Sequence, residues 1–589
     1  MYLYNMKLWN FRKYGSIEDF NINKPNLNVS LKKGLNLLIG ENDAGKTAII
    51  DALKLVLKTS SYEWVQLTHD DFYENSERIR IELRFREFKP EEAKNFTEFL
   101  SWERYNDKDE SILIVIYDVS RRDGRIIPSD LKAGSDGIGK AMPAEMRDYL
   151  KVTYLKPLRD AKTELTPKKN SRLSQIFQEH EAFKNNKEHL LLSIYEKFNV
   201  AIKSYFEGKD IDGNILIDDQ NGKELKNSID ASIKGFFTDK NEVSINTTHA
   251  EIKKILESLE LTLSDLLNPG LGSLNRLFIA SELVHLNKNN WTGLRLGLIE
   301  EIEAHLHPQI QLKVINSIQN LEETQLIVTT HSPNLASKVP LDKLIVCRNN
   351  AAYSLDPEFT CLEKSNYIFL EKFLDVTKSN LFFAKGLILV EGWAEEILVP
   401  IIAKKIGLDL VKHEISIINV GNLGFSHYYK IFSRKDGLGM DIPISVITDC
   451  DERAYDEVIE NSKKEYRKRD ITEYRRECDI RTTKVIKGFS EPAKPFVSYE
   501  WTFEWCLYKS AILGSKFIEI MKLIHSGTEW DNEELKLAEK LINKSLNKTE
   551  ISYKLAKNLE NDDLVISLEE LEKDVYIKYI IEAIQNVCK

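Results

Sequence analysis

The residues from Gly40 to Thr47 read GENDAGKT and match the pattern G-x-x-x-x-G-K-[ST] in full. They follow the apolar run LNLLI and lead into AIIDALKLVL, so the sequence predicts a strand, a glycine-rich loop and a helix. In such a loop the backbone N–H groups and the helix N-terminus surround phosphate oxygens. We expect Lys46 to reach the β and γ phosphates and Thr47 to hold Mg²⁺. The predicted nucleotide-binding residues of the loop are Gly40, Asn42, Gly45, Lys46 and Thr47.

Two further apolar runs end in residues that suit nucleotide hydrolysis. LRLGLI predicts a strand over residues 294–299 that ends at Glu300 and Glu301, and QLIVTT predicts another that ends at His331. We expect Glu300 to support Mg²⁺ and Glu301 to orient or deprotonate the attacking water. We expect His331 to contact the γ-phosphate.

The composition limits the remaining possibilities. With 589 residues the chain is too long for one core, and its shares of 42% apolar and 30% charged residues are those of a globular protein. No apolar run approaches the roughly 18 residues that cross a bilayer, and the N-terminus lacks the apolar core of a signal peptide. The six cysteines form no CxxC pair. We therefore expect a cytoplasmic protein without a membrane partner. A zinc site made of His305, His307 and His331 is the weaker alternative, because the neighbouring glutamates already have a role.

The C-terminal half predicts a second set of strands that end in carboxylates. GLILV leads to Glu391, a helix follows with Glu395 in its first turn, and IPISVIT leads to Asp449 and Asp451. Residues two apart in an extended segment point to the same side, and the carboxyl ends of parallel strands meet at one edge. Oxygen ligands of this density favour Mg²⁺ or Mn²⁺ over zinc. The alternative is a surface turn at the Asp pair with Glu391 as a cap.

Two later stretches extend this hypothesis. SYEWTFEWCLYKSAIL places Glu504 in an apolar and aromatic setting, where an idle carboxylate is not expected. The stretch 463–487 holds ten Lys or Arg residues against five acidic ones. It is either a solvated helix with i,i+4 ion pairs or an arm that contacts DNA phosphates. The net charge of −10 does not by itself indicate nucleic-acid binding.

These motifs carry a resemblance. GENDAGKT, LIEEIEAHLHP and TTHS, in that order, resemble ATP-binding-cassette ATPases related to chromosome-maintenance and recombination proteins. The strand-end glutamate followed by D-x-D resembles the Toprim domain. An ATPase head followed by Toprim is the layout of the OLD (overcoming lysogenization defect) family nucleases, and the resemblance extends to Gabija A subunits and retron-associated effectors.

The resemblance implies an α/β fold: an ABC-type ATPase head with a helical dimerisation insert, then a Toprim α/β domain with a helical C-terminal extension. The expected parts are residues 1–165 and 256–375 for the head, 166–255 for the insert and 380–589 for the Toprim domain. A plain solvated helical hairpin is the alternative for the insert.

The resemblance also adds site residues. It implies that Arg12 contacts the nucleotide and that Ser273, with Gly272 and Asn275, forms the signature loop that reaches the nucleotide of a second head. It implies that Glu504 and a lysine complete a two-metal site, with Lys548 favoured over Lys554. The glutamine loop is left open among Gln66, Asp70 and Asp71. The implied catalytic residues are Glu301, His331, Glu391, Asp449, Asp451 and Lys548. The implied metal ligands are Thr47, Glu300, Glu391, Glu395, Asp449, Asp451 and Glu504.

The implied function is an ATP-binding, divalent-metal-dependent endonuclease that nicks or cleaves double-stranded DNA in anti-phage defence. Its cofactors would be ATP and Mg²⁺ or Mn²⁺, with two ions at the Toprim site. It would act as a homodimer or higher oligomer, with a possible neighbour-encoded defence partner. The main alternative is a DNA repair or maintenance ATPase whose Toprim domain binds without cleaving. A topoisomerase-like enzyme lacks an obvious domain with a catalytic tyrosine.

Overall fold

A largely parallel sheet forms the centre of the N-terminal part. Its six strands run in the order β10-β11-β12-β3-β13-β14, all parallel except the edge strand β14. Strand β3 is buried along its whole length, as expected for a parallel strand covered on both faces. The strands are β3 (Leu35–Ile39), β10 (Thr153–Leu155), β11 (Leu296–Ile299), β12 (Gln325–Thr330), β13 (Leu344–Arg348) and β14 (Ala351–Ser354).

The computed structural model describes residues 1–59, 65–105, 107–157, 164–183, 189–233, 244–245, 251–264, 269–286, 291–321, 323–421, 424–437, 439–460, 463–561, 570 and 573–588.

A second, antiparallel sheet covers one side of the first. Helix α1 (Lys46–Leu57) packs between the two sheets, where its Ile49 and Leu53 share a core with Phe85 of the second sheet and Leu298 of the first. The strand order is β2-β1-β4-β6-β8-β9, and β5 and β7 also pair with β6. The strands are β1 (Tyr2–Trp9), β2 (Leu27–Ser30), β4 (Arg78–Arg86), β5 (Leu100–Tyr105), β6 (Lys108–Arg122), β7 (Arg125–Ile127), β8 (Lys132–Ala133) and β9 (Lys140–Ala141), with short helices α2 (Pro90–Ala93) and α3 (Ala144–Asp148).

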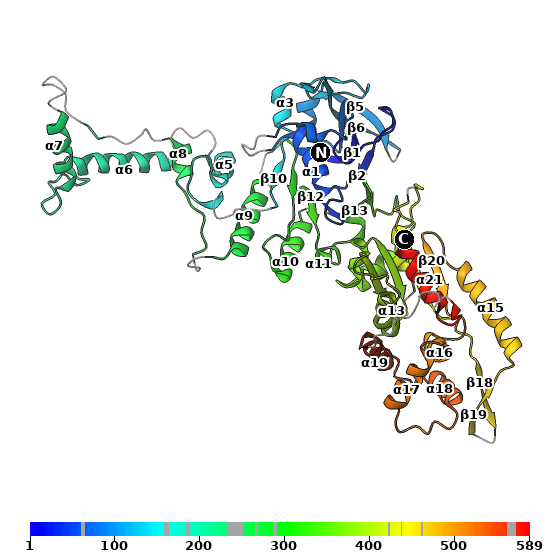
Figure 1. The fold of residues 1–589 in the computed structure, drawn as a ribbon. Coiled ribbons are helices and arrows are strands. Elements are labelled where there is room, and N and C mark those ends of the chain that lie inside the picture. Colours follow the sequence, from blue (N-terminus) through cyan, green and yellow to red (C-terminus); the bar gives the residue numbers. More distant parts are fainter. Residues whose placement is uncertain are drawn as a thin grey trace.

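A group of helices leaves this head between β10 and β11. Figure 1 shows α6 and α7 reaching far from both sheets, while α9 stays against the head. The buried ion pair of Arg172 with Glu282, at 2.6 Å, ties α5 to α9. The helices are α5 (Arg172–Glu179), α6 (Leu190–Phe206), α7 (Asn221–Ile233), α8 (Ile252–Glu257) and α9 (Leu271–Leu286), and after the Glu300 strand comes α10 (Pro308–Gln319). Residues 184–188, 234–243 and 246–250 of the expected insert lie outside the described residues.

The C-terminal part contains a four-stranded, fully parallel sheet in the order β16-β15-β17-β20. Alternate residues of β15 face opposite sides. Leu387 and Leu389 join the core that continues into the head, whereas Ile388 and Val390 join a second core under the C-terminal helices. The strands are β15 (Gly386–Val390), β16 (Ile415–Asn419), β17 (Ile444–Thr448) and β20 (Ala493–Val497).

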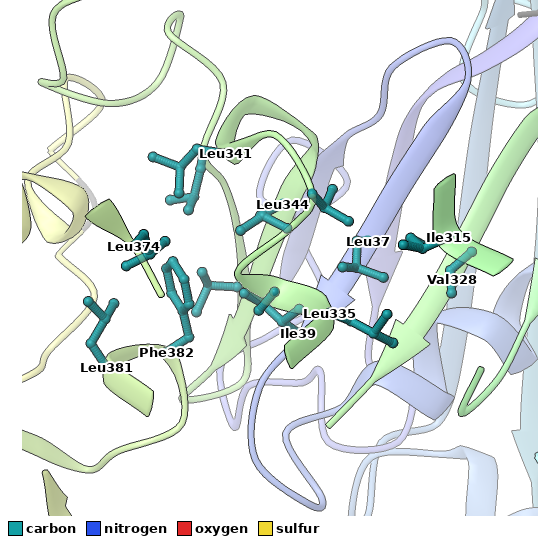
Figure 2. Close-up of a cluster of buried hydrophobic side chains, with 14 of the residues drawn as sticks. Leu37, Ile39, Ile315, Val328, Leu335, Leu341, Leu344, Leu374, Leu381 and Phe382 are labelled. Atoms are coloured by element: carbon teal, nitrogen blue, oxygen red, sulfur yellow. The ribbon is translucent and has the colours of Figure 1, made fainter. Parts of the chain in front are cut away.

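The head and this sheet share one hydrophobic core. Helix α11 (Pro333–Ala336) lies within the head, between β12 and β13. The segment that connects β14 to β15 contains α12 (Lys364–Phe373) and buries Leu374, Leu381 and Phe382 in the same cluster as Ile39 of β3 (Figure 2). The same cluster includes Leu387 on β15. The two parts are therefore packed together by apolar contact rather than joined by a flexible linker.

Helices and a hairpin complete the C-terminal part. The basic stretch 463–487 is not one helix: residues 463–468 form β19, which pairs with β18 (Tyr455–Glu460), and α15 covers only Ile471–Lys487. The helices are α13 (Trp393–Lys405), α14 (Ser426–Tyr429), α16 (Phe503–Lys509), α17 (Gly514–Ile524), α18 (Glu533–Ile542), α19 (Lys548–Asn561) and α21 (Lys578–Val587). Among the described residues, no helix is both long and apolar enough to span a membrane.

Candidate nucleotide and metal sites

The loop from Gly40 to Thr47 surrounds the side chain of Lys46. Lys46 is buried, and its Nζ donates to the carbonyls of Gly40 at 2.8 Å and Glu41 at 2.6 Å. Burial lowers the pKa of Lys46. Gly45 has φ of 99° and Gly40 has φ of 145°, values that favour glycine. A phosphate would offer this ammonium a hydrogen bond in which donor and acceptor are both charged, which is stronger than its bonds to neutral carbonyls.

Glu300 lies beside this loop at the end of β11. The hydroxyl of Tyr154 donates to its Oε1 at 2.8 Å. Burial raises the pKa of Glu300, and hydrogen bonds from Tyr154 and Thr47 oppose that rise. The fold thus brings together Thr47 and Glu300, the two residues predicted to hold the cation of the nucleotide. Tyr154 was not predicted, because its contact joins segments 146 residues apart.

His331 connects the loop with the acidic segment after β11. Lys46 Nζ lies 3.2 Å from its Nδ1, and its Nε2 lies 4.0 Å from Glu301 Oε1. Burial and the charge of Lys46 lower the pKa of His331, so the neutral imidazole is favoured. Its backbone N–H donates to Glu303 Oε1 at 2.6 Å. Glu303 is an acidic residue at this edge that the sequence did not single out.

The other predicted nucleotide residues have different surroundings. Arg12 is held by two carboxylates, Asp51 of α1 at 2.7 Å and Asp71 at 2.8 Å, so it braces the helix that follows the loop. Asn42 is exposed in the loop. Ser273 lies in the first turn of α9, where its Oγ accepts a hydrogen bond within that helix. Roles for Arg12, Asn42 and Ser273 toward a nucleotide stay predictions.

The alternative zinc site is not formed. The Nδ1 of His307 accepts the N–H of Gln309 at 3.4 Å and caps α10. In the part of the chain that the structure describes, no three His, Cys, Asp or Glu side chains are gathered as metal ligands. His305, His307 and His331 are therefore not assembled around a metal.

Glu391 and Asp449 follow two adjacent parallel strands, β15 and β17. Glu391 Oε1 accepts hydrogen bonds from the Thr448 hydroxyl and from the Asp449 N–H, the latter at 3.2 Å. Asp449 Oδ1 accepts the N–H of Phe503 at 2.8 Å, in the first turn of α16. Burial raises the pKa of Asp449 well above its ordinary value, and the charge of Glu391 adds to the rise. Two strands thus carry two carboxylates to one edge of the sheet.

Two more acidic side chains lie behind this pair. Glu395, in the first turn of α13, is 7% exposed, and its Oε2 has no hydrogen-bond partner among the described residues. Burial, with the nearby charge of Glu504, raises the pKa of Glu395 to about 7. Glu504 is 1% exposed and pairs with Lys548 Nζ at 2.8 Å. Burial alone would lower the pKa of Lys548, but Glu504 and Asp449 outweigh it and raise that pKa.

The geometry of Asp451 differs from the expectation. The extended segment ends at Thr448, and Asp451 has φ of 61°, in the left-handed region. Its N–H donates to the carbonyl of Trp501 at 2.8 Å, so this bond and not strand alternation sets its direction. It still lines a cavity of about 860 Å³ with the other acidic residues. The predicted site residues on this cavity are Glu391, Glu395, Asp449, Asp451, Glu504 and Lys548. Lys554, the second lysine candidate, instead pairs with Glu550 at 3.1 Å.

The donors of the cavity are of the kind that suits a hard divalent cation, but in the described part of the chain they are not yet gathered closely enough to hold one, so an ion would have to draw them together. The donor groups are carboxylate oxygens, which Mg²⁺ and related ions prefer. The unpartnered Oε2 of Glu395 is an exception to the rule that buried polar atoms are satisfied, and a cation would remove it. The carboxylates that would hold the ion are those of Glu391, Glu395, Asp449 and Glu504.

A phosphate loop at the edge of one parallel sheet and a carboxylate cavity at the edge of another define an ATPase joined to a Toprim-type metal site. The chain belongs to the AAA ATPase domain family, whose profile matches residues 1–336. Residues 382–451 match the TOPRIM domain of overcoming lysogenization defect protein-like proteins. The predicted combination of the two domains is thereby confirmed, and it implies the use of a nucleotide and of a divalent metal.

Similar proteins cover most of the chain. It is 22% identical to "Endonuclease GajA" of Bacillus cereus (strain HuB5-5), over 95% of this chain and 94% of that protein. It is 24% identical to "Endonuclease GajA" of Bacillus cereus (strain VD045), over 72% of this chain and 71% of that protein. It is 24% identical to "OLD nuclease" of Thermus scotoductus, over 73% of this chain and 81% of that protein.

The nucleotide site predicts two distinct defects. Lys46→Ala removes the buried cation of the loop and should weaken ATP binding roughly ten- to hundredfold. Glu301→Gln should keep binding but slow hydrolysis by a factor of about 10² to 10⁴, because an amide cannot accept the proton of water. Fluorescent-nucleotide titration and phosphate release measure the two, with the exposed Lys33→Ala as control. Equal loss of binding in both variants would show that these roles are wrongly divided.

The carboxylate cavity predicts a pH-dependent metal affinity. Glu395 keeps its proton up to about pH 7, so a cation must displace that proton at lower pH. The affinity for Mn²⁺ should therefore rise between about pH 6 and 8. Calorimetry in buffers of different ionisation enthalpy should show fewer protons released per ion in Glu395→Gln than in the wild type. The neighbouring Glu396→Gln, whose carboxylate accepts from Asn419, should behave as wild type. Unchanged proton release in Glu395→Gln would remove Glu395 from the ligand set.

Proposed function

We propose that this protein is an ATP-binding, divalent-metal-dependent DNA endonuclease that nicks or cleaves duplex DNA in antiviral defence. The observation that carries the proposal is the pair Glu391 and Asp449, delivered by adjacent parallel strands to a cavity with further buried carboxylates. The relatives named as endonucleases support the same reaction class. We propose Mg²⁺ or Mn²⁺ as the ion, with two ions in the cavity.

In the proposed reaction, water attacks the phosphorus of a phosphodiester and the bond to the 3′ oxygen breaks. Bound cations would supply the Lewis acidity that activates water and stabilises the leaving oxygen. Thr448 and the N–H of Phe503 orient the carboxylates of Glu391 and Asp449 that would hold them. The ammonium of Lys548, which is 46% exposed and pairs with Glu504, would offset the charge of the phosphate.

We further propose that the protein acts as a homodimer or larger assembly, with a neighbour-encoded defence partner as a further possibility. None of the side chains of helix α6 is fully buried, although more than half of them are apolar. Leu190, Ile194 and Phe198, spaced four apart on one face, are 70%, 52% and 55% exposed. A second copy of this helix would cover such a face, because it offers the same apolar surface in return.

The endonuclease proposal predicts that Glu391→Ala and Asp449→Ala abolish nicking of supercoiled plasmid in Mg²⁺ or Mn²⁺. Loss of one ligand withdraws transition-state stabilisation, so we expect at least about a hundredfold loss. Folding and ATP binding should be unchanged, since both residues lie in the cavity of the Toprim domain and not in the ATPase head. Glu396→Ala, one residue beyond Glu395, serves as the matched control. Wild-type nicking in either site variant would refute the assignment, and a wild type that binds DNA without cutting would favour the repair alternative.

The assembly proposal predicts that a charge on the exposed face of α6 disrupts association. Ile194→Glu or Phe198→Glu should shift the mass measured by sedimentation velocity to that of a smaller species, because burying an unpaired carboxylate is unfavourable. Lys203→Glu changes charge on another face of the same helix and should leave the mass unchanged. A mass that is equal in all three variants would exclude this face from the interface.

A further inference from the structure

Arg348 links the nucleotide-binding sheet to the strand that ends at Glu391. It is the last residue of β13, and its guanidinium crosses to the segment just before β15. Nη1 donates to the carbonyl of Ala384 at 2.6 Å and Nη2 to that of Lys385 at 2.7 Å. Strand β15 begins at the next residue, Gly386. One side chain therefore holds two successive backbone carbonyls at the base of the strand that presents Glu391.

The other end of this link lies against the phosphate loop. Strand β13 is the parallel neighbour of β3, with Val346 opposite Ile39. The carbonyl of Cys347 would lie only 2.3 Å from a Cβ placed on Gly40, so the loop and the end of β13 are in direct backbone contact. If the loop shifts toward β13 at Gly40, β13 must therefore move as well, because the two backbones would otherwise clash. Arg348 is the residue that follows Cys347.

One nitrogen of the guanidinium, Nε, stands apart from these two bonds. It is buried and has no hydrogen-bond partner among the described residues. Burial lowers the pKa of Arg348, and the charge of Glu41, the second residue of the phosphate loop, opposes that effect. A buried donor without a partner is unusual in a settled structure. A second arrangement, in which Nε gains a partner as the loop moves, would satisfy it.

We propose that Arg348 is a positioning residue that couples the phosphate loop to the Glu391 strand, so that nucleotide binding changes the placement of the metal-binding edge. The proposal rests on the proposed function, since it names how nucleotide acts on that site. Nucleotide would act only to the extent that it binds two arrangements of the loop unequally. Arginine suits this role because its planar fork bonds two acceptors at once, which a lysine ammonium does not do with fixed geometry.

Hydrogen exchange of the full-length protein, with and without a non-hydrolysable ATP analogue, tests the link directly. In the wild type, nucleotide should change exchange in peptides covering residues 384–391 by at least about fivefold, the low end of usual couplings. In Arg348→Ala and Arg348→Lys this response should fall below about twofold, while nucleotide affinity stays within about twofold of wild type. The lysine variant keeps the charge, so its loss of response would assign the effect to the fork.

Arg434→Ala is the matched control. Its Nη1 also donates across the two parts, to the carbonyl of Ser354 at 3.0 Å. Ser354 pairs with Ile345, however, at the end of β14 remote from Arg348. This variant should keep the wild-type response. If it loses the response as Arg348→Ala does, the two arginines merely hold the domains together and the positioning role is refuted.

Plasmid nicking across rising nucleotide concentration gives a second readout. Wild-type nicking should depend on nucleotide, and nicking by Arg348→Ala should proceed without that dependence. A nucleotide response of wild-type size in both Arg348 variants, or no exchange response in the wild type, overturns the proposal. A wild type that never nicks refutes the endonuclease proposal instead, and the exchange experiment still decides the role of Arg348.

Discussion

The hydrophobic core shared by the two parallel sheets is the interaction on which the rest of the structure depends. Ile39 precedes the phosphate loop, Leu389 precedes the Glu391 edge, and both belong to one buried cluster. Burial of each such side chain contributes about 1.5–3 kcal/mol, so separating the sheets would expose many of them at a large cost. The nucleotide edge and the metal edge are therefore held against each other by packing, and small shifts between them pass through the polar contacts within that frame.

Within this frame the two edges are built alike. At each edge, parallel strands carry acidic residues at their carboxyl ends. At each edge, one of these carboxylates also accepts a hydrogen bond from a residue outside its own strand. Glu300 accepts from Tyr154, and Asp449 accepts from the N–H of Phe503. These outside donors orient the carboxylates, as groups that hydrogen-bond to metal ligands commonly do. The two edges differ in the surroundings of the lysine: Lys46 is enclosed by its loop, whereas Lys548 is about half exposed and lines a cavity.

Local patterns predicted the class of fold and the chemical character of both edges. The phosphate loop and the strand-end acids are readable because each depends on a few consecutive residues and on the direction of a parallel strand. The sequence could not predict Tyr154 at Glu300, Arg348 at Ala384, or the bond from Asp451 to Trp501, because these contacts join distant segments. The strand over residues 463–468 was also missed, since its partner strand lies outside the basic stretch and the charge pattern alone did not distinguish strand from helix.

The exposed face of α6 makes the order of this helix depend on how much of the protein is present. A helix with no fully buried side chain gains less from tertiary packing than a core helix does, and most of the stability of helices in proteins comes from such packing. If a second chain packs on the exposed face of α6, the free energy that stabilises this helix depends on protein concentration through mass action. A cell that makes few copies would then hold mostly single chains in which α6 is frayed. Raising expression would order α6 and bring two chains together in one step, without any change in the chain itself.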